Sequence, residues 1–163
     1  MKYFDQEKKM FKPMIRQDKE ISKEEAQKIL INNEYGVLST INAENYPYGV
    51  PVHYVFKDEA IYIHCAAEGQ KLDCIRQNAK VSFCVVGPTE VLPDKFSAKY
   101  ESVIVFGKAK ELEGNAKHDA LVMILKKYSS DYMHEGEELI AKAKDEVVVI
   151  KISIEHMSGK ARK

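Results

Sequence analysis

A glycine and a lysine stand at the start of a short predicted helix, in an arrangement that is typical of an anion site. Gly69 and Lys71 introduce residues 70–76, whose apolar spacing is helical. The first amide groups of a helix have no intrahelical partner, a glycine lets a ligand approach the backbone, and an ammonium group adds positive charge. This segment therefore predicts a phosphate site, with an ordinary exposed lysine at a helix end as the alternative.

Two histidines and a cysteine lie in the predicted strands that precede this helix. His64 and Cys65 are neighbours, and adjacent strand residues point to opposite faces, so they can neither share a metal ion nor form a histidine-activated thiol. His64 is expected either to donate a hydrogen bond at the rim of a pocket or to be a hydrogen-bonded wall residue. His53 could meet a ligand from either face of its strand. The remaining histidines are expected at the surface: His118, His134 and His156.

The strand expected at residues 46–56 is unusual because it contains Pro47, Gly49 and Pro51. Proline cannot donate to a hydrogen-bonded ladder, so such a strand needs a sheet edge, a bulge or a neighbour that is not a strand. We interpret this strand as the place where a flat ligand approaches the backbone.

Composition and motifs argue against several other kinds of site. The chain has 25 basic and 25 acidic residues, which disfavours nucleic-acid binding and attraction to an anionic membrane. Its three cysteines form no C-x-x-C pair, so neither a disulfide framework nor a structural zinc site is expected. No H-E-x-x-H, G-x-S-x-G or G-x-G-x-x-G pattern occurs. We expect no metal and, without a signal peptide or a membrane-spanning run, a cytoplasmic protein.

A single small domain is expected to position these residues. Residues 1–20 predict a charged amino-terminal arm, and residues 21–163 predict one domain. At the start of the domain, Ser22 and Glu25 form a capping box before a helix predicted over residues 23–33.

The rest of the chain predicts a mainly β fold with short helices. Residues 87–98 contain glycine and two prolines and are expected to be a long loop, and the final G-K-A-R-K is expected to be a solvated tail. Hydrophobic alternation predicts six strands, at residues 35–41, 46–56, 60–64, 80–86, 100–110 and 146–154. Further helices are expected at residues 70–76, 115–128 and 137–143. This order predicts a six-stranded antiparallel β-barrel rather than βαβ units.

Three long segments carry a family resemblance. They are EYGVLSTINAENYPYGVPVHYVF (34–56), IYIHCAAEGQKLDCIRQNAKVSFCVVG (61–87) and YESVIVFGKA (100–109). In these segments the chain resembles the pyridoxamine 5′-phosphate oxidase-like, FMN-binding split-barrel superfamily. Within it, the resemblance is greatest to the nitroimidazole-resistance (Nim) group and extends to the terminal IEHMSGKARK.

The resemblance implies a homodimer of six-stranded split barrels with an FMN at each end of the subunit interface, which passes electrons to a small substrate. It places His64 near flavin and substrate as the catalytic residue, His64 and Cys65 beside the ribityl chain and phosphate, and Lys71 on the phosphate. The segment along the isoalloxazine ring would be Val50, Pro51, Val52 and His53. The segment that reaches the other subunit's flavin would be Glu101 and Ser102.

Two departures separate this chain from the vitamin oxidases of the superfamily. Those enzymes carry serine, arginine and lysine where this chain has Gly69, Gln70 and Lys71, so one basic phosphate partner is missing. They also use a carboxy-terminal tryptophan near the cofactor, and this chain has no tryptophan. Both differences argue against pyridoxamine phosphate oxidation. Other basic side chains could replace the missing arginine: Arg16, Lys160 or Arg162.

The leading hypothesis is an FMN-dependent oxidoreductase that reduces a small electrophile, with nitroimidazole-type nitro compounds as the favoured class. The alternative is a non-enzymatic protein that stores or senses FMN, haem or another tetrapyrrole. A third hypothesis is a scaffold without a cofactor. The sequence specifies neither the physiological substrate nor the electron donor.

Overall fold

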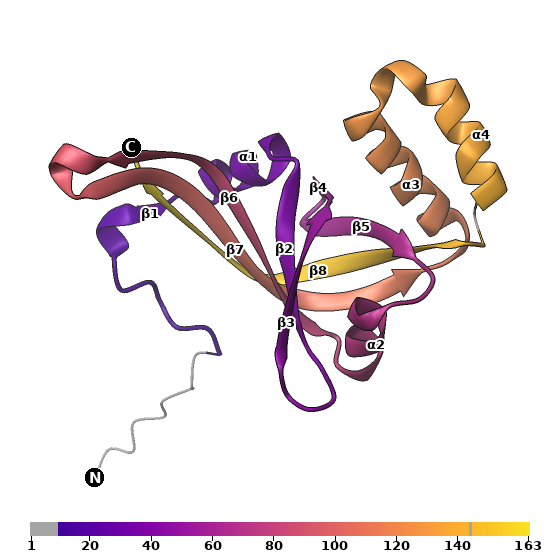
Figure 1. Cartoon of the computed structure of the whole chain (residues 1–163), viewed down its shortest axis with the longest axis horizontal. Coiled ribbons are helices and arrows are strands. Elements are labelled where there is room, and N and C mark those ends of the chain that lie inside the picture. The colour runs from indigo at the N-terminus through magenta and orange to yellow at the C-terminus, as the bar shows by residue number, and fades with distance from the viewer. Residues whose placement is uncertain (1–9, 144) are drawn as a thin grey trace, which may run out of the picture.

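The computed structural model describes residues 10–143 and 145–163 (Figure 1). In this part of the chain, eight strands form one antiparallel sheet to which four α-helices are attached. The strands are β1 (Glu20–Ile21), β2 (Tyr35–Ile41), β3 (Pro47–His53), β4 (Val55–Lys57), β5 (Ala60–Ala66), β6 (Lys80–Leu92), β7 (Ser97–Leu112) and β8 (Val147–Arg162). The helices are α1 (Lys23–Asn32), α2 (Gln70–Gln77), α3 (Gly114–Tyr128) and α4 (Met133–Ala143).

The sheet curls into a split barrel because its two outer strands are consecutive in the chain. The strands lie in the order β3-β2-β6-β7-β8-β5-β4, and β1 pairs with β8. β3 ends at His53 and β4 begins at Val55, so Tyr54 alone joins the two sheet edges. A sheet whose edges are one residue apart must bend back on itself. Tyr54 is fully buried at this seam, and its hydroxyl donates to the Leu30 carbonyl at 2.7 Å.

The observed elements confirm the predicted mainly β class. Six of the eight described strands are long and correspond to the six expected, whereas β1 and β4 add only two and three residues. β2 has the predicted bounds. The strand expected at residues 46–56 is divided at Tyr54 into β3 and β4, because that residue turns into the core.

The prediction of a loop over residues 87–98 was wrong. β6 and β7 continue through this segment as a hairpin, in which Thr89 pairs with Tyr100. The glycine and the prolines do not break the ladder, because they fall at a register shift between Val86 and Thr89 and at the tip, where a 3-10 turn starts at Pro93. The hairpin extends away from the barrel on one side of the molecule (Figure 1).

The prediction of a free carboxy-terminal tail was also wrong. The segment G-K-A-R-K lies almost entirely in β8, where Lys160 pairs with Glu20 of β1 and with Ser102 of β7. Pairing with β1 on one side and β7 on the other therefore orders residues whose charge alone predicted an unstructured, solvated tail.

The proline-containing strand β3 lies at an edge of the sheet, as its composition requires. Its pairing with β2 is continuous, from Tyr35 with His53 to Ile41 with Pro47. The prolines therefore interrupt no ladder, and the second edge of β3 is unpaired among the described strands.

The barrel interior is filled by alternate strand residues and closed by α1. Ala26, Ile29 and Leu30 of α1 are buried against the barrel core. The predicted capping box is present, because Ser22 Oγ accepts the Glu25 N–H and the Glu25 carboxylate accepts the Ser22 N–H, both at 3.2 Å. The buried strand residues include Leu38, Ile61, Ile63, Phe83, Val85, Val103, Val105, Ile150 and Ile152.

Helices α3 and α4 form a hairpin at the end of the molecule opposite the tip of the β6–β7 hairpin (Figure 1). Ala120 and Leu121 of α3 pack with Val149 of β8 in a second apolar cluster. Helix α4 lies against α3 at Gly136, where a Cβ atom would overlap the Leu125 side chain. No described helix is long and apolar enough to cross a membrane.

Candidate functional site

Strand β5 places His64 and Cys65 on opposite faces, as expected for adjacent strand residues. Cys65 points into the barrel core, and burial raises the pKa of its thiol, which therefore stays protonated. His64 lies on the outer face. In residues 10–143 and 145–163, no group of three or more His, Cys, Asp or Glu side chains is placed to hold a metal ion.

His64 is electrically coupled to His53 and Lys71. Partial burial is the main cause that lowers the pKa of His64, and the positive charges of His53 and Lys71 lower it further. The imidazole is consequently neutral at pH 7, so one ring nitrogen donates a hydrogen bond and the other accepts one. Residues from β3, β5 and α2 thus lie near enough to one another to interact electrostatically.

We expect His64 to titrate below 6.5, its ordinary pKa, in an NMR titration of the imidazole signals. Replacing His53 by glutamine should raise that pKa, because one positive neighbour is removed. In the unfolded chain His64 is protonated near pH 6.5, whereas in the folded chain it is protonated only at lower pH. Acidification through this range should therefore lower the free energy of unfolding. The loss should be smaller in His64→Gln, and a His64 midpoint at or above 6.5 would contradict the expectation.

His53 is held in one orientation at the end of β3. Its Nδ1 lies 3.1 Å from the Glu34 carbonyl oxygen, which can only accept, so Nδ1 carries the proton and Nε2 is left for a ligand. The His53 ring also packs edge-on against the Tyr128 ring, with the ring centroids 5.1 Å apart.

Two residues at the end of α3, Lys127 and Tyr128, fix the backbone beside His53. The Tyr128 hydroxyl accepts the Tyr54 N–H at 3.0 Å and lies 2.6 Å from the Tyr54 carbonyl oxygen. Lys127 donates to the Asn33 and Tyr54 carbonyls at 2.7 and 3.0 Å, and its ammonium lies 4.3 Å from the Tyr54 ring centroid. Sequence reasoning missed both roles. The available signal was a polar pair at the end of an otherwise apolar helix face.

The four β3 residues expected along a flavin ring divide between the two faces of the strand. Val50 and Val52 are half-buried and pack on the barrel core, so their side chains belong to the wall. Pro51 and His53 are exposed on the other face. A ligand at this strand would therefore meet Pro51, His53 and the unpaired backbone edge.

The start of α2 has the features of an anion site. Gly69 is the N-cap residue with φ of 138°, which other residues rarely adopt, and a Cβ atom there would meet nothing within 4 Å. Lys71 follows in the first turn. Arg76 is committed elsewhere, because it pairs with Glu111 at 2.7 Å and thereby lowers the pKa of that carboxyl group. One ammonium group, an open backbone and a helix amino terminus fit a single phosphate group.

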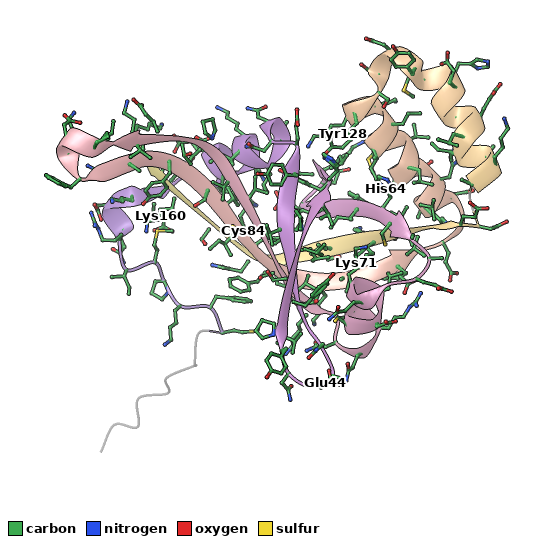
Figure 2. The ribbon with its side chains drawn as sticks, in the orientation of Figure 1. Glu44, His64, Lys71, Cys84, Tyr128 and Lys160 are labelled. Carbon is green, nitrogen blue, oxygen red and sulfur yellow. The ribbon has the colours of Figure 1, made fainter. Side chains whose placement is uncertain are left out.

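His53 and His64 both line one pocket between the sheet and the α3–α4 hairpin. Its volume is about 420 Å³, within the range of small-molecule sites. None of the described residues that line it is acidic. Figure 2 shows His64 facing the side of the barrel that carries Tyr128. The apolar part of the lining includes Leu121, Ile124, Leu125, Leu139, Ile140 and Val147.

Glu101 and Ser102 do not join this group within one chain. They lie on β7, where Ser102 pairs with Lys160 of β8. Figure 2 shows Lys160 at the opposite end of the molecule from His64 and Lys71. A ligand held at Lys71 could meet Glu101 or Ser102 only from a second chain.

Comparison with known proteins agrees with this architecture. A family model described as pyridoxamine 5′-phosphate oxidase matches residues 22–161, which run from the cap of α1 into the end of β8. The chain belongs to the pyridoxamine 5′-phosphate oxidase-like family. This is a flavin-binding family, and the residues at the start of α2 fit the phosphate that a flavin nucleotide carries. No curated protein is significantly similar in sequence to this family member.

Several solved structures share the split-barrel fold. A candidate 5-nitroimidazole antibiotic resistance protein from Bacteroides thetaiotaomicron has a TM-score of 0.75 at 23% identity, over 87% of this chain and 86% of that chain. A FAD-binding protein from Mesorhizobium loti has a TM-score of 0.62 at 24% identity, over 88% of this chain and 97% of that chain. A FAD and haem binding protein from Mycobacterium smegmatis has a TM-score of 0.76 at 17% identity, over 89% of this chain and 74% of that chain. At these identities the similarity establishes the fold.

Proposed function

We propose that this protein is an FMN-dependent oxidoreductase that reduces a small electrophile, with nitroimidazole-type nitro compounds as the favoured substrates. The observation that carries the proposal is that His53, at the end of the edge strand β3, and His64 line one pocket, with Lys71 near enough to lower the pKa of His64. Membership of a flavin-binding family supports the cofactor class. The similarity to a candidate nitroimidazole-resistance protein supports the substrate class.

The positions of these groups support an assignment of the cofactor residues. Lys71 and the start of α2 would bind the phosphate, and Pro51, His53 and the backbone of β3 would lie along the ring. A single cationic side chain suits the one phosphate of FMN better than the pyrophosphate of FAD. When bound, the flavin would supply two electrons as a hydride. Because Gln70 stands where the vitamin oxidases have arginine, pyridoxamine phosphate oxidation is not part of the proposal.

His64 would act on the substrate as a neutral hydrogen-bond donor. Its lowered pKa keeps the ring uncharged, and the N–H group can polarise an oxygen on which negative charge develops. Apolar residues of α3 and α4 would exclude water from that hydrogen bond and strengthen it.

The direct test is the turnover of a nitroimidazole with a reduced nicotinamide as electron donor. We expect His64→Ala to lower turnover about 100-fold, since positioned proton donors contribute on that order. The fold and the flavin content should stay unchanged. His118→Ala is the matched control, because His118 is exposed on α3 and does not line the pocket. Wild-type turnover in His64→Ala would remove His64 from the mechanism.

We further propose that the protein is a homodimer through the outer face of β2, β6 and β7. On this face Val37, Cys84 and Ile104 lie side by side in register, flanked by Val86 and Phe106. Ile104 is 42% exposed and Val86 is 56% exposed. Contiguous exposed apolar surface of this kind is typical of an interaction site.

A dimer would also complete the flavin site. Glu101 and Ser102 lie far from Lys71 within one chain, so only a second copy could bring them to a flavin held there. If Glu101 and Ser102 contact the flavin, as the family resemblance implies, two chains meet at one ligand, which is the same assembly that the apolar face favours.

A second candidate function is non-enzymatic binding of FMN or haem. It is favoured by the presence of two histidines, His53 and His64, in one apolar pocket, because histidine is a common axial ligand of haem iron. The absorption spectrum of the purified protein separates the candidates. A flavin spectrum with release of FMN on denaturation supports the reductase, whereas a Soret band supports haem binding.

A cytoplasmic location is part of the proposal. The three cysteines are free thiols in the structure, and two of them, Cys65 and Cys74, are buried. Reduced cysteines are typical of a reducing compartment, which supports this location.

A further inference from the structure

We propose that the pocket between the sheet and the α3–α4 hairpin binds an aromatic molecule that carries an amide-type edge, with one N–H group beside one carbonyl oxygen. The pocket receives residues from β3, β5, α3, α4 and β8. His53 and His64 belong both to this pocket and to the proposed reductase site, so the inference rests on the proposed function for its biological sense. The test of the inference does not depend on the proposed function, because binding is measured without an electron donor.

The helix α4 supplies an apolar wall that the described part of the chain covers only in part, because Ile140 packs against α3 and β8. Gly136, Ile140 and Ala143 recur one turn apart and line the pocket together with Leu139. No residue of α4 is buried, and Leu139 is 64% exposed. An amphipathic helix normally buries its apolar face in a core, whereas here that face borders a cavity. A compact apolar ligand would cover it.

The two histidines determine the polar part of the ligand. His53 uses its Nδ1 proton on the Glu34 carbonyl, so in the tautomer that this contact selects the Nε2 atom is the hydrogen-bond acceptor. His64, also neutral, donates one from the ring nitrogen that carries its proton. The His53 acceptor and the His64 donor, both in this pocket, match one donor and one acceptor on the ligand.

The charges around the pocket favour a neutral ligand with this polarity. None of the described lining residues is acidic, which disfavours a cationic ligand. Lys71 lies close enough to His64 to lower its pKa, so the carbonyl end of the ligand would lie on that side. The Tyr128 hydroxyl is already bonded to the backbone at Tyr54 and does not compete for the ligand.

The test uses the purified full-length protein with whatever flavin it retains, and isothermal titration with four naphthalene probes. We expect 2-naphthamide to bind most tightly. N,N-dimethyl-2-naphthamide, which lacks the donor, should bind at least ten-fold more weakly, and 2-methylnaphthalene more weakly still. Tighter binding of 2-naphthoate than of 2-naphthamide would overturn the proposal, because the site would then recognise an anion. Absence of saturable binding of 2-naphthamide would overturn it as well.

Two matched variants locate the binding. Ala143→Phe places a ring in the pocket and should weaken 2-naphthamide binding at least ten-fold, whereas Ala141→Phe lies on the same helix outside the lining and should not. Equal effects of the two changes would overturn the proposal. So would a change of molecular mass in Ala143→Phe alone, because a second copy of the chain would then be the occupant.

A third variant tests the recognition itself. His53→Phe removes the acceptor but keeps a ring, so the ten-fold preference for 2-naphthamide over its dimethyl derivative should disappear. Thermal unfolding of this variant within a few degrees of the wild type would show that the fold is retained. An unchanged preference would overturn the assignment of His53, and if the variant does not fold, His53→Gln gives the same comparison.

Discussion

An Ile104→Glu variant is expected to be monomeric and to lose its flavin during purification. Ile104 lies at the β7 end of the exposed apolar row on β2, β6 and β7, beside Cys84 and next to Phe106 along the strand face. In the proposed dimer the carboxylate would be buried without a partner, at a cost of several kcal/mol, which exceeds what a modest interface can offset. Light scattering should give the mass of one chain, 18.6 kDa. Absorbance after denaturation should show little or no released flavin.

A matched control separates the interface from the added charge. Lys110→Glu adds a carboxylate to the same face of β7 but outside the apolar row, so the dimer and its flavin should be retained. A dimeric Ile104→Glu protein would refute the proposed interface. A monomer with full flavin content would instead show that the cofactor site is complete within one chain, against the role proposed for Glu101 and Ser102.

A Gly107→Val variant is expected to lower the free energy of unfolding by about 3 kcal/mol, the upper part of the range for overpacking a core. Gly107 lies at the register shift between β7 and β8, where a Cβ atom would overlap the Ser153 carbonyl oxygen and lie 3.0 Å from Ile152 Cγ2. Because the obstacle is backbone, no rotamer change relieves it. Urea unfolding followed by circular dichroism measures the shift in midpoint.

Gly49→Val is the control for this change. A Cβ atom at Gly49 would come no closer than 3.4 Å to the Val37 side chain, and the residue is exposed on the edge strand β3. Since β-branched residues suit strands, its stability should stay within about 0.5 kcal/mol of the wild type. If the two substitutions lower the free energy of unfolding by the same amount, strand propensity would explain the effect, rather than the close approach of the β8 backbone to Gly107.

The elements that sequence could predict are those determined by local signals. The capping box of Ser22 and Glu25 and the alternation of residues 35–41 depend on neighbours in the sequence, and both are observed. The β6–β7 hairpin and the end of β8 depend on partners far along the chain. The glycine and prolines of residues 87–98 indicated a loop, and the lysines of the last residues indicated a tail. Both segments are strands because they pair with residues distant in the sequence.

The candidate site divides in the same way. His64 and Lys71 are close in the sequence, so their proximity could be foreseen from a strand followed by a helix. The contributions of Lys127 and Tyr128 depend on how α3 docks beside Tyr54, which no local pattern encodes. The distance of Glu101 from this site follows from its position along the 16-residue strand β7, whose other end carries the Glu111 that pairs with Arg76 of α2.

The unpaired edge of β3 has a consequence for solubility. A free strand edge is a template for strand addition, the first step of edge-to-edge aggregation. β4, at the other end of the sheet, is only three residues long, and Pro47 and Pro51 remove two donors from β3. A flat ligand along β3 would cover the donors and acceptors that remain. Any ligand at this edge therefore also protects the chain from self-association. When the ligand is lost, the two prolines of β3 are the main features that disfavour strand addition at this edge.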